Sequence, residues 1–237
     1  MSKEKIITAP IGYVEALEHL TKLFWRSLKD GWRLGCIGGL IDAEKLKEWV
    51  NAPGFRGVRM WFCKKPGEKP VFMVMEPVFE DFYASHDIPT NVRVGQDFSI
   101  AKSLIMGEDL EEINLFNWFR GEEGNLDAES NPVFSPQQTF DPQDVESWKE
   151  EFLRVYANCP LNKQGWTYFI DKTAQGNEIK DFVNNSNLSY LGYCFGYDHS
   201  CSDNCLRVML MPVNSSGRNI PSVAATSMLQ YSWPPKT

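Results

Sequence analysis

A cluster of sulfur and nitrogen donors lies near the carboxyl end of the sequence. The segment CFGYDHSCSDNC contains Cys194, His199, Cys201 and Cys205, and thiolate sulfur and imidazole nitrogen are the usual ligands of tetrahedral zinc. The spacing lacks the paired C-x2-C elements of structural zinc sites, so the sequence favours a polar turn with reduced thiols or a local disulfide between Cys201 and Cys205. These four residues are the candidate metal ligands; no cofactor is expected, and zinc is the one metal that the cluster suggests.

A thiolate nucleophile activated by a histidine is a second possible chemistry. Cys36 is the candidate nucleophile, and His86 with its neighbour Asp87 would supply a base and a carboxylate, because a thiol needs such a base for activation. Cys36 falls in an expected strand, where a thiol is usually a small core residue. His86 falls in an expected loop, where an exposed histidine is the alternative. Cys36, His86 and Asp87 are the candidate catalytic residues.

Glycines surround Cys36 in the segment Gly35-Cys36-Ile37-Gly38-Gly39, between an expected strand and an expected helix. Backbone amides at such a junction can bind an anion beside a helix N-terminus. No Lys-Ser/Thr pair of a phosphate-binding loop follows, so a turn that requires positive φ explains the glycines better. No cofactor-binding residue is therefore assigned.

Two tryptophans, Trp118 and Trp233, are the candidate partner-binding residues. They stand in INLFNWF and YSWPPKT, and aromatic side chains are enriched at interface hot spots. The alternative, which the sequence favours, is that they hold the connector and the tail against the body of the protein.

The composition is typical of a globular protein with one large or two small domains: 237 residues, 43% hydrophobic and 23% charged. No apolar run approaches the roughly 20 residues of a transmembrane helix, and the start MSKEKIITAP lacks the apolar region of a secretory signal. The six cysteines are irregularly spaced, which predicts reduced thiols rather than a disulfide framework. We therefore expect a cytoplasmic protein that has no membrane partner.

The net charge of −7 is unevenly distributed along the chain. Residues 1–70 carry +5, residues 71–152 carry −14 and residues 153–237 carry +2. Nucleic-acid binding usually requires clustered lysines and arginines, and no stretch supplies such a basic stripe, so no nucleic acid is expected as a partner. The segment 107–124 mixes carboxylates with aromatic residues, as in a segment that covers a core or contacts a basic partner.

Two parts of the chain resemble each other over six collinear blocks, which predicts an internal duplication. The clearest block aligns KLKEWVN (45–51) with EIKDFVN (178–184). Short apolar runs recur by chance, but a series in constant order at offsets of 131 to 135 residues is a much stronger signal. The other blocks align 14–25 with 145–156, 31–37 with 165–171, 58–62 with 191–195, 71–78 with 206–213 and 87–90 with 219–222.

The sequence pattern of each copy predicts the order helix, strand, helix, strand, strand. Apolar residues at helical spacing begin at Val14 and at Val145, and Gly-Trp pairs then open short strands. Asp42 is an N-cap candidate for the second helix of the first copy. The expected ranges are strands 32–37 and 166–170, helices 42–50 and 177–184, and hairpins of 57–63 with 70–76 and 189–197 with 206–211.

The expected fold class is α+β, a tandem duplication of an α-β-α-β-β unit. It would form two three-stranded sheets, or one joined sheet, with helices on one face and a pseudo-two-fold axis. A three-stranded sheet leaves a face or an edge open, so the copies are expected to share one core, and oligomers remain possible. The expected divisions are a first unit over 10–94, an acidic connector over 95–142 with short helices at 98–106 and 110–119, and a second unit over 143–237 with a Trp-Pro-Pro tail.

The motifs of the first copy follow a distinctive order. A helix with Trp25-Arg26 precedes an extended segment at 32–36, a helix at 42–50, the strand GVRMWF at 57–62 and an apolar run at 71–75. In this order the unit resembles a group of small uncharacterised bacterial proteins, over about a third of the chain. The resemblance implies a helix-strand-helix-hairpin architecture and a bacterial source, and it implies no activity.

The sequence therefore predicts a non-enzymatic binding or protein-interaction protein, whose cleft or open sheet edge contacts a protein or a small ligand. Two alternatives stay open. One is a small-molecule enzyme with a site between the two copies, and the other is a zinc-binding protein.

Overall fold

The protein is a mixed α+β structure built on antiparallel sheets. The structure, a computed structural model, describes residues 8–31, 34–68, 71–79, 99–100, 102–105, 141–159, 165–170, 178–185, 188–198, 205–213 and 228–231. The helices are α1 (Tyr13–Asp30), α2 (Ala43–Asn51), α4 (Pro142–Val155) and α5 (Glu178–Asn185). The strands are β1 (Thr8–Ile11), β2 (Cys36–Asp42), β3 (Gly57–Lys64), β4 (Val71–Val78), β5 (Ser99–Ile100), β6 (Lys102–Ile105), β7 (Trp166–Ile170), β8 (Tyr190–Tyr197), β9 (Leu206–Val213) and β10 (Met228–Tyr231).

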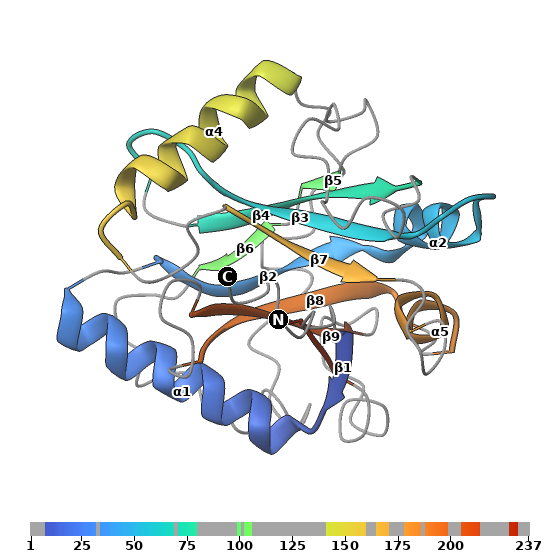
Figure 1. Ribbon diagram of the computed structural model, residues 1–237, viewed down its shortest axis with the longest axis horizontal. Coiled ribbons are helices and arrows are strands. Elements are labelled where there is room, and N and C mark those ends of the chain that lie inside the picture. Colours follow the sequence, from blue (N-terminus) through green and yellow to red (C-terminus); the bar gives the residue numbers. More distant parts are fainter. Residues whose placement is uncertain are drawn as a thin grey trace, which may run out of the picture.

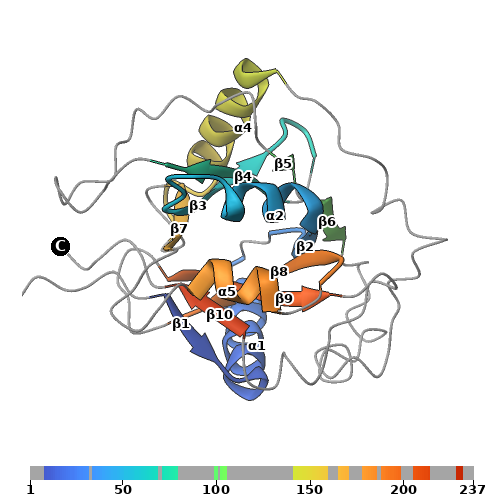
Figure 2. The same ribbon diagram turned by 90° about the vertical axis from the view of Figure 1, so that its right-hand side faces the viewer.

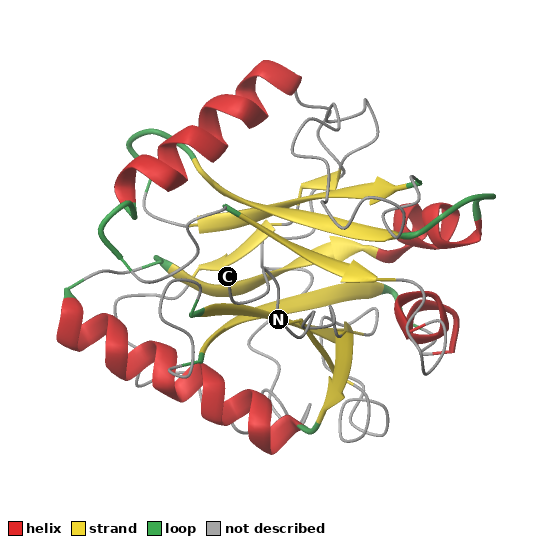
Figure 3. Ribbon diagram, in the orientation of Figure 1, coloured by secondary structure: helices red, strands yellow, loops and turns green. Residues whose placement is uncertain are grey.

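The described strands form two sheets, in the orders β1-β10-β9-β8-β2-β6 and β5-β4-β3-β7. The sheets lie face to face, and each carries one long helix on its outer side (Figures 1 and 2). Helix α1 packs on β8 and β9, and helix α4 packs on β3. Helices α2 and α5 contact each other at one end of the two sheets, so the strands are enclosed by helices on three sides (Figure 3).

Each sheet contains a strand that pairs with a hairpin from the opposite half of the chain. Strand β2 pairs with β8, from Gly38 opposite Cys194 to Asp42 opposite Tyr190. Strand β7 pairs with β3, from Trp166 opposite Trp61 to Ile170 opposite Gly57. Both hairpins form as expected, and each pairs on one side with a strand from the other half of the chain.

The two halves nevertheless repeat one order of elements. The series α1-β2-α2-β3-β4 is followed, after β5 and β6, by α4-β7-α5-β8-β9, and the four hairpin strands have eight residues each. Where α2 meets α5, each of Asn51 and Asn184 donates its side-chain N–H to the amide oxygen of the other, at 3.4 Å in both directions. These two residues occupy the same place in the aligned blocks KLKEWVN and EIKDFVN.

Strand β2 begins later than the sequence predicts and continues directly into α2. Gly38 and Gly39 pair with β6 on one side and with β8 on the other, so their backbone groups belong to a sheet and form no anion-binding loop. A Cβ atom at Gly38 would lie 1.9 Å from the Tyr193 carbonyl oxygen. This glycine therefore permits the close approach of β2 to β8, whereas Gly35, with φ of 71°, is the one that makes the turn.

The helix expected at 98–106 is also absent from the described part of that segment. Residues Ser99–Ile100 form β5, which pairs with β4, and Lys102–Ile105 form β6, which pairs with β2. Backbone groups at the edge of a sheet can pair with an added extended segment. This tertiary pairing outweighs the helical spacing of apolar residues in the segment. The helix expected at 110–119 lies outside the described residues.

One hydrophobic core contains side chains from both halves. Phe62 of β3 stacks on Phe152 of α4 at 5.2 Å between ring centroids and lies 6.0 Å from Phe195 of β8. The backbone N–H of Met73 donates to the Tyr193 hydroxyl at 3.3 Å. No helix within the described ranges has both the length and the apolar character needed to cross a membrane.

Replacing Gly38 tests whether the β2–β8 contact holds the fold together. We expect Gly38→Ala to lower the free energy of unfolding by about 3 kcal/mol or more, since a methyl group here meets rigid backbone rather than a flexible side chain. The matched control is Gly12→Ala, because nothing lies within 4 Å of a Cβ at Gly12. Urea unfolding of both variants measures the difference, and equal stabilities would contradict the close approach.

Candidate functional site

The candidate catalytic residues are not brought together by the described part of the chain. Cys36 begins strand β2, while His86 and Asp87 lie outside the described residues. A thiol-histidine site therefore stays a prediction.

Of the candidate zinc ligands, two lie in or beside the β8–β9 hairpin and are buried. Cys194 lies within β8 and Cys205 directly precedes β9; His199 and Cys201 lie outside the described residues. Burial raises the pKa of the Cys194 thiol well above its ordinary value, and zinc binds the thiolate form. The described residues contain no group of three or more potential ligands near one another, so the zinc site also stays a prediction.

The candidate partner-binding residues Trp118 and Trp233 lie outside the described ranges. Among the described tryptophans, Trp25 on α1 is exposed, with 65% of its surface accessible. Trp49 and Trp61 are buried, as are Phe182 and Cys194, with which the sequence aligns them. The exposed tryptophan that could mark a binding surface thus lies on α1.

Helix α1 carries apolar residues on two opposite sides. Ala16, Leu20 and Leu23 are buried against the sheet. On the other side, Val14 is 63% exposed and Leu28 is 45% exposed, in line with Trp25. Most surface helices have one apolar stripe facing the core and a polar face toward water, so the second stripe has no role in packing α1 on its own sheet.

A groove of about 780 Å³ follows the outer side of α1. Its lining comes from five successive turns of the helix and from Tyr197 at the end of β8. The charge of its lining changes along the helix: Glu18 lies toward the N-terminus, and Lys22, Arg26 and Lys29 follow toward the C-terminus. Among the described residues, its lining is Val14, Leu17, Glu18, Thr21, Lys22, Trp25, Arg26, Lys29 and Tyr197.

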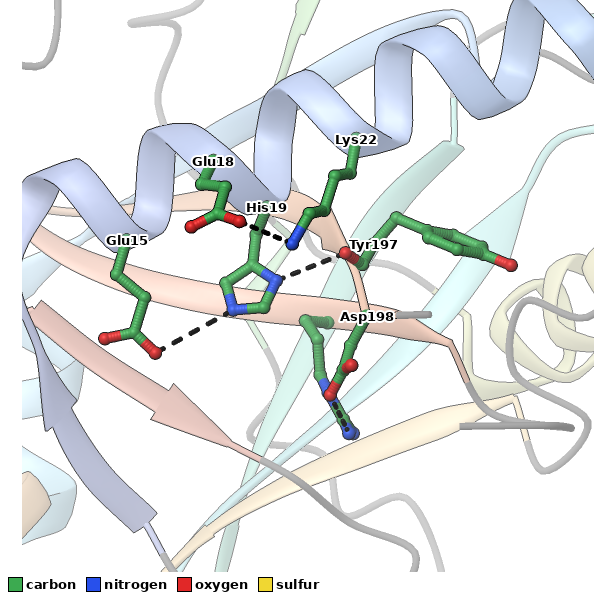
Figure 4. A network of polar contacts seen from close by, with 7 residues as sticks. Glu15, Glu18, His19, Lys22, Tyr197 and Asp198 are labelled. Carbon is green, nitrogen blue, oxygen red and sulfur yellow. Dashed lines mark hydrogen bonds and ion pairs between the residues drawn. The ribbon is translucent and has the colours of Figure 1, made fainter. Parts of the chain in front are cut away.

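Polar contacts fix α1 to the end of β8 (Figure 4). His19 donates from Nδ1 to the Tyr197 carbonyl oxygen at 3.2 Å, and its Nε2 lies 4.0 Å from the Glu15 carboxylate. A Cβ at Gly196 would lie 2.7 Å from the His19 Cβ, so helix and strand are in close contact here. One imidazole nitrogen is thus bound to backbone, which indicates that His19 positions the helix.

Further contacts of α1 and Tyr197 form the rim of the groove. Arg26 lies over the Tyr197 ring, 5.8 Å from its centroid, and its guanidinium pairs with Asp30 at 2.9 Å. Burial, followed by a hydrogen bond with Cys205, raises the pKa of the Tyr197 hydroxyl, so this ring stays neutral at physiological pH. Lys22 pairs with Glu18 at 2.6 Å along the helix.

A second polar cluster is buried in the other sheet. Arg59 of β3 and Glu76 of β4 lie opposite each other, have 0% and 2% exposure, and form an ion pair. The Trp61 indole N–H donates to the same Glu76 oxygen at 2.9 Å. Lys149 of α4 covers the Trp61 ring, with its ammonium 3.7 Å from the ring centroid.

This ion pair is not required by the hairpin architecture. The corresponding rung of the β8–β9 hairpin pairs Gly192 with Met211, and the Met211 side chain occupies the space that a Cβ at Gly192 would need. Burial raises the pKa of the Glu76 carboxyl above its usual range, against the opposing effects of Arg59 and the Trp61 hydrogen bond. The same position is thus ionic in one sheet and apolar in the other.

No protein-family model, curated protein or solved structure matches this chain significantly.

The buried ion pair predicts a marked difference between single and double variants. Glu76→Ala is expected to lower the free energy of unfolding by about 3 to 5 kcal/mol, because it leaves the Arg59 cation buried without its carboxylate. The double variant Arg59→Met with Glu76→Met is expected to retain most of the stability, since apolar replacement of a buried pair is often neutral. Urea unfolding of the single and double variants decides this, and a double variant as unstable as Glu76→Ala, or less stable, would contradict the expectation.

Proposed function

We propose that this protein is a non-enzymatic protein-interaction protein that binds its partner through the outer face of α1, on a scaffold of two copies of one α-β-α-β-β unit. The observation that carries the proposal is the exposed apolar stripe of α1, with Trp25 at 65% exposure inside a groove lined by both charged and aromatic side chains. Exposed tryptophan beside aliphatic side chains and arginine is the composition of interface hot spots.

The duplication is supported by the repeated element order and by the reciprocal amide contact of Asn51 with Asn184. A contact in which two aligned residues exchange the same hydrogen bond is expected on a pseudo-two-fold axis. The equal lengths of β3 and β8, and of β4 and β9, also support a duplication. The resemblance of the unit to small uncharacterised bacterial proteins remains part of this proposal.

A comparison of α1 with α4 supports the binding role of α1. The aligned blocks match Val14 with Val145 and Trp25 with Tyr156. Val145 and Tyr156 are buried, with α4 packed on β3, whereas Val14 and Trp25 are exposed. The side of α1 that corresponds in sequence to a packing surface is therefore free of its own sheet, which suits a helix that packs against a partner.

Site-specific cross-linking tests the proposal. A photoreactive phenylalanine replaces Thr21, at the middle of the groove, in the full chain expressed in its native cells; the control replaces Ser147, an exposed residue of α4. We expect one discrete protein adduct from position 21, its loss when Trp25→Asp is added, and no such adduct from position 147. Failure of position 21 to give a discrete adduct would overturn the proposal.

The stability of Trp25→Asp shows whether Trp25 acts in binding or in folding. Because Trp25 is exposed and packs little against the core, its replacement is expected to change the free energy of unfolding by less than about 1 kcal/mol. Urea unfolding measures this change. A loss of several kcal/mol would assign the tryptophan to folding.

A further inference from the structure

We infer that the partner of the outer face of α1 is a second copy of this chain, bound as an antiparallel helix pair with Thr21 at the two-fold axis. This inference rests on the proposed interaction function and names its partner. A two-fold interface must be self-complementary, because the same patch contributes from both sides. The spacing, the charge and the accessibility of α1 all meet this requirement.

The spacing of the exposed stripe is symmetric about Thr21. Leu17 and Trp25 stand four residues before and after Thr21, and Val14 and Leu28 stand seven residues before and after it. Rotation about an axis through Thr21 therefore places Leu17 of one copy against Trp25 of the other, and Val14 against Leu28. These offsets of four and seven fall on one side of a helix. The small side chain of Thr21 lets the two helices approach closely at the axis.

The charges beside the stripe also favour an antiparallel arrangement. The N-terminal half of α1 contributes Glu15 and Glu18, and the C-terminal half contributes Lys22, Arg26 and Lys29 together with one acid, Asp30, which pairs with Arg26. An antiparallel pair brings the acidic half of each helix alongside the basic half of the other. A parallel pair would instead align like charges, which is unfavourable. The helix thus carries both halves of a complementary charge pattern.

The face is accessible for such a pair. Helix α1 lies on the outside of its sheet, and no other described element covers its outer side (Figures 1 and 2). With 18 residues, the helix is about 27 Å long. A single helix pair buries less than a standard stable interface, so we expect a dimer with a dissociation constant in the micromolar range, about 1 to 100 μM.

Sedimentation velocity over a concentration series tests the inference on the purified full chain. We expect a reversible monomer–dimer equilibrium that Trp25→Asp weakens about tenfold or more. The control Leu153→Asp removes an exposed leucine of α4 and is expected to leave the equilibrium unchanged. A strictly monomeric chain at 200 μM, or a dimer that Trp25→Asp leaves intact, would overturn the inference.

Disulfide trapping tests the position of the axis. Two copies of a residue on a two-fold axis face each other, so Thr21→Cys is expected to form a covalent dimer under mild oxidation, while Ser147→Cys and the unmodified chain are not. Circular dichroism confirms that each variant is folded. Absence of a covalent dimer from Thr21→Cys, where sedimentation shows a dimer, would also overturn the arrangement.

The in-cell cross-link separates failure of this inference from failure of the proposed function. An adduct of twice the chain mass that contains only this chain supports both. An adduct with a different protein overturns the second-copy inference and leaves the interaction function standing. Absence of a discrete adduct overturns both.

Discussion

The pairing of β2 with β8 and of β7 with β3 is the constraint on which the rest of the structure depends. Each hairpin, β3–β4 or β8–β9, pairs on one side with a strand from the opposite half of the chain. Two-stranded hairpins are marginal by themselves, and three strands with a packed face are needed for stability. Both described sheets therefore combine strands of the two halves, and the single core that joins Phe62, Phe152 and Phe195 contains side chains of both.

The exchange also places the helices. Because β2 joins the sheet of β8 and β9, the helix before it, α1, lies on that sheet, and α4 lies on the sheet of β3 by the same connection. The two halves differ in what they build on this plan. One hairpin has a buried Arg59–Glu76 pair where the other has Gly192 and Met211, and α4 buries the stripe whose aligned residues α1 exposes. The two halves repeat one order of elements, and the outer side of α1 is where they differ in accessibility.

Local patterns in the sequence predicted the helices and hairpins, because helical spacing and turn-rich joints act over a few residues. The partner of β2 was not predictable in this way: a short apolar strand pairs equally well with either hairpin until the whole chain is packed. Gly38 is an example, because the need for glycine at this position comes from the Tyr193 carbonyl oxygen of β8, a strand that is distant in the sequence. The site was missed for a similar reason. Helical spacing from Val14 predicts an amphipathic helix, and only the contacts of α1 with Gly196 and Tyr197 show which of its sides faces outward.

That orientation is what suits α1 for binding. A surface that is already ordered loses little conformational entropy when a partner binds. Close contact at Gly196 and the bond from His19 to the Tyr197 carbonyl hold the helix against the strand end, while Arg26 over the Tyr197 ring closes the side of the groove. The apolar stripe thus lies on a helix whose opposite side packs on the core, and that core contains side chains from both halves of the chain. The exchanged strands and the exposed stripe are therefore two parts of one arrangement, because the sheet that accepts β2 is the one that orients α1.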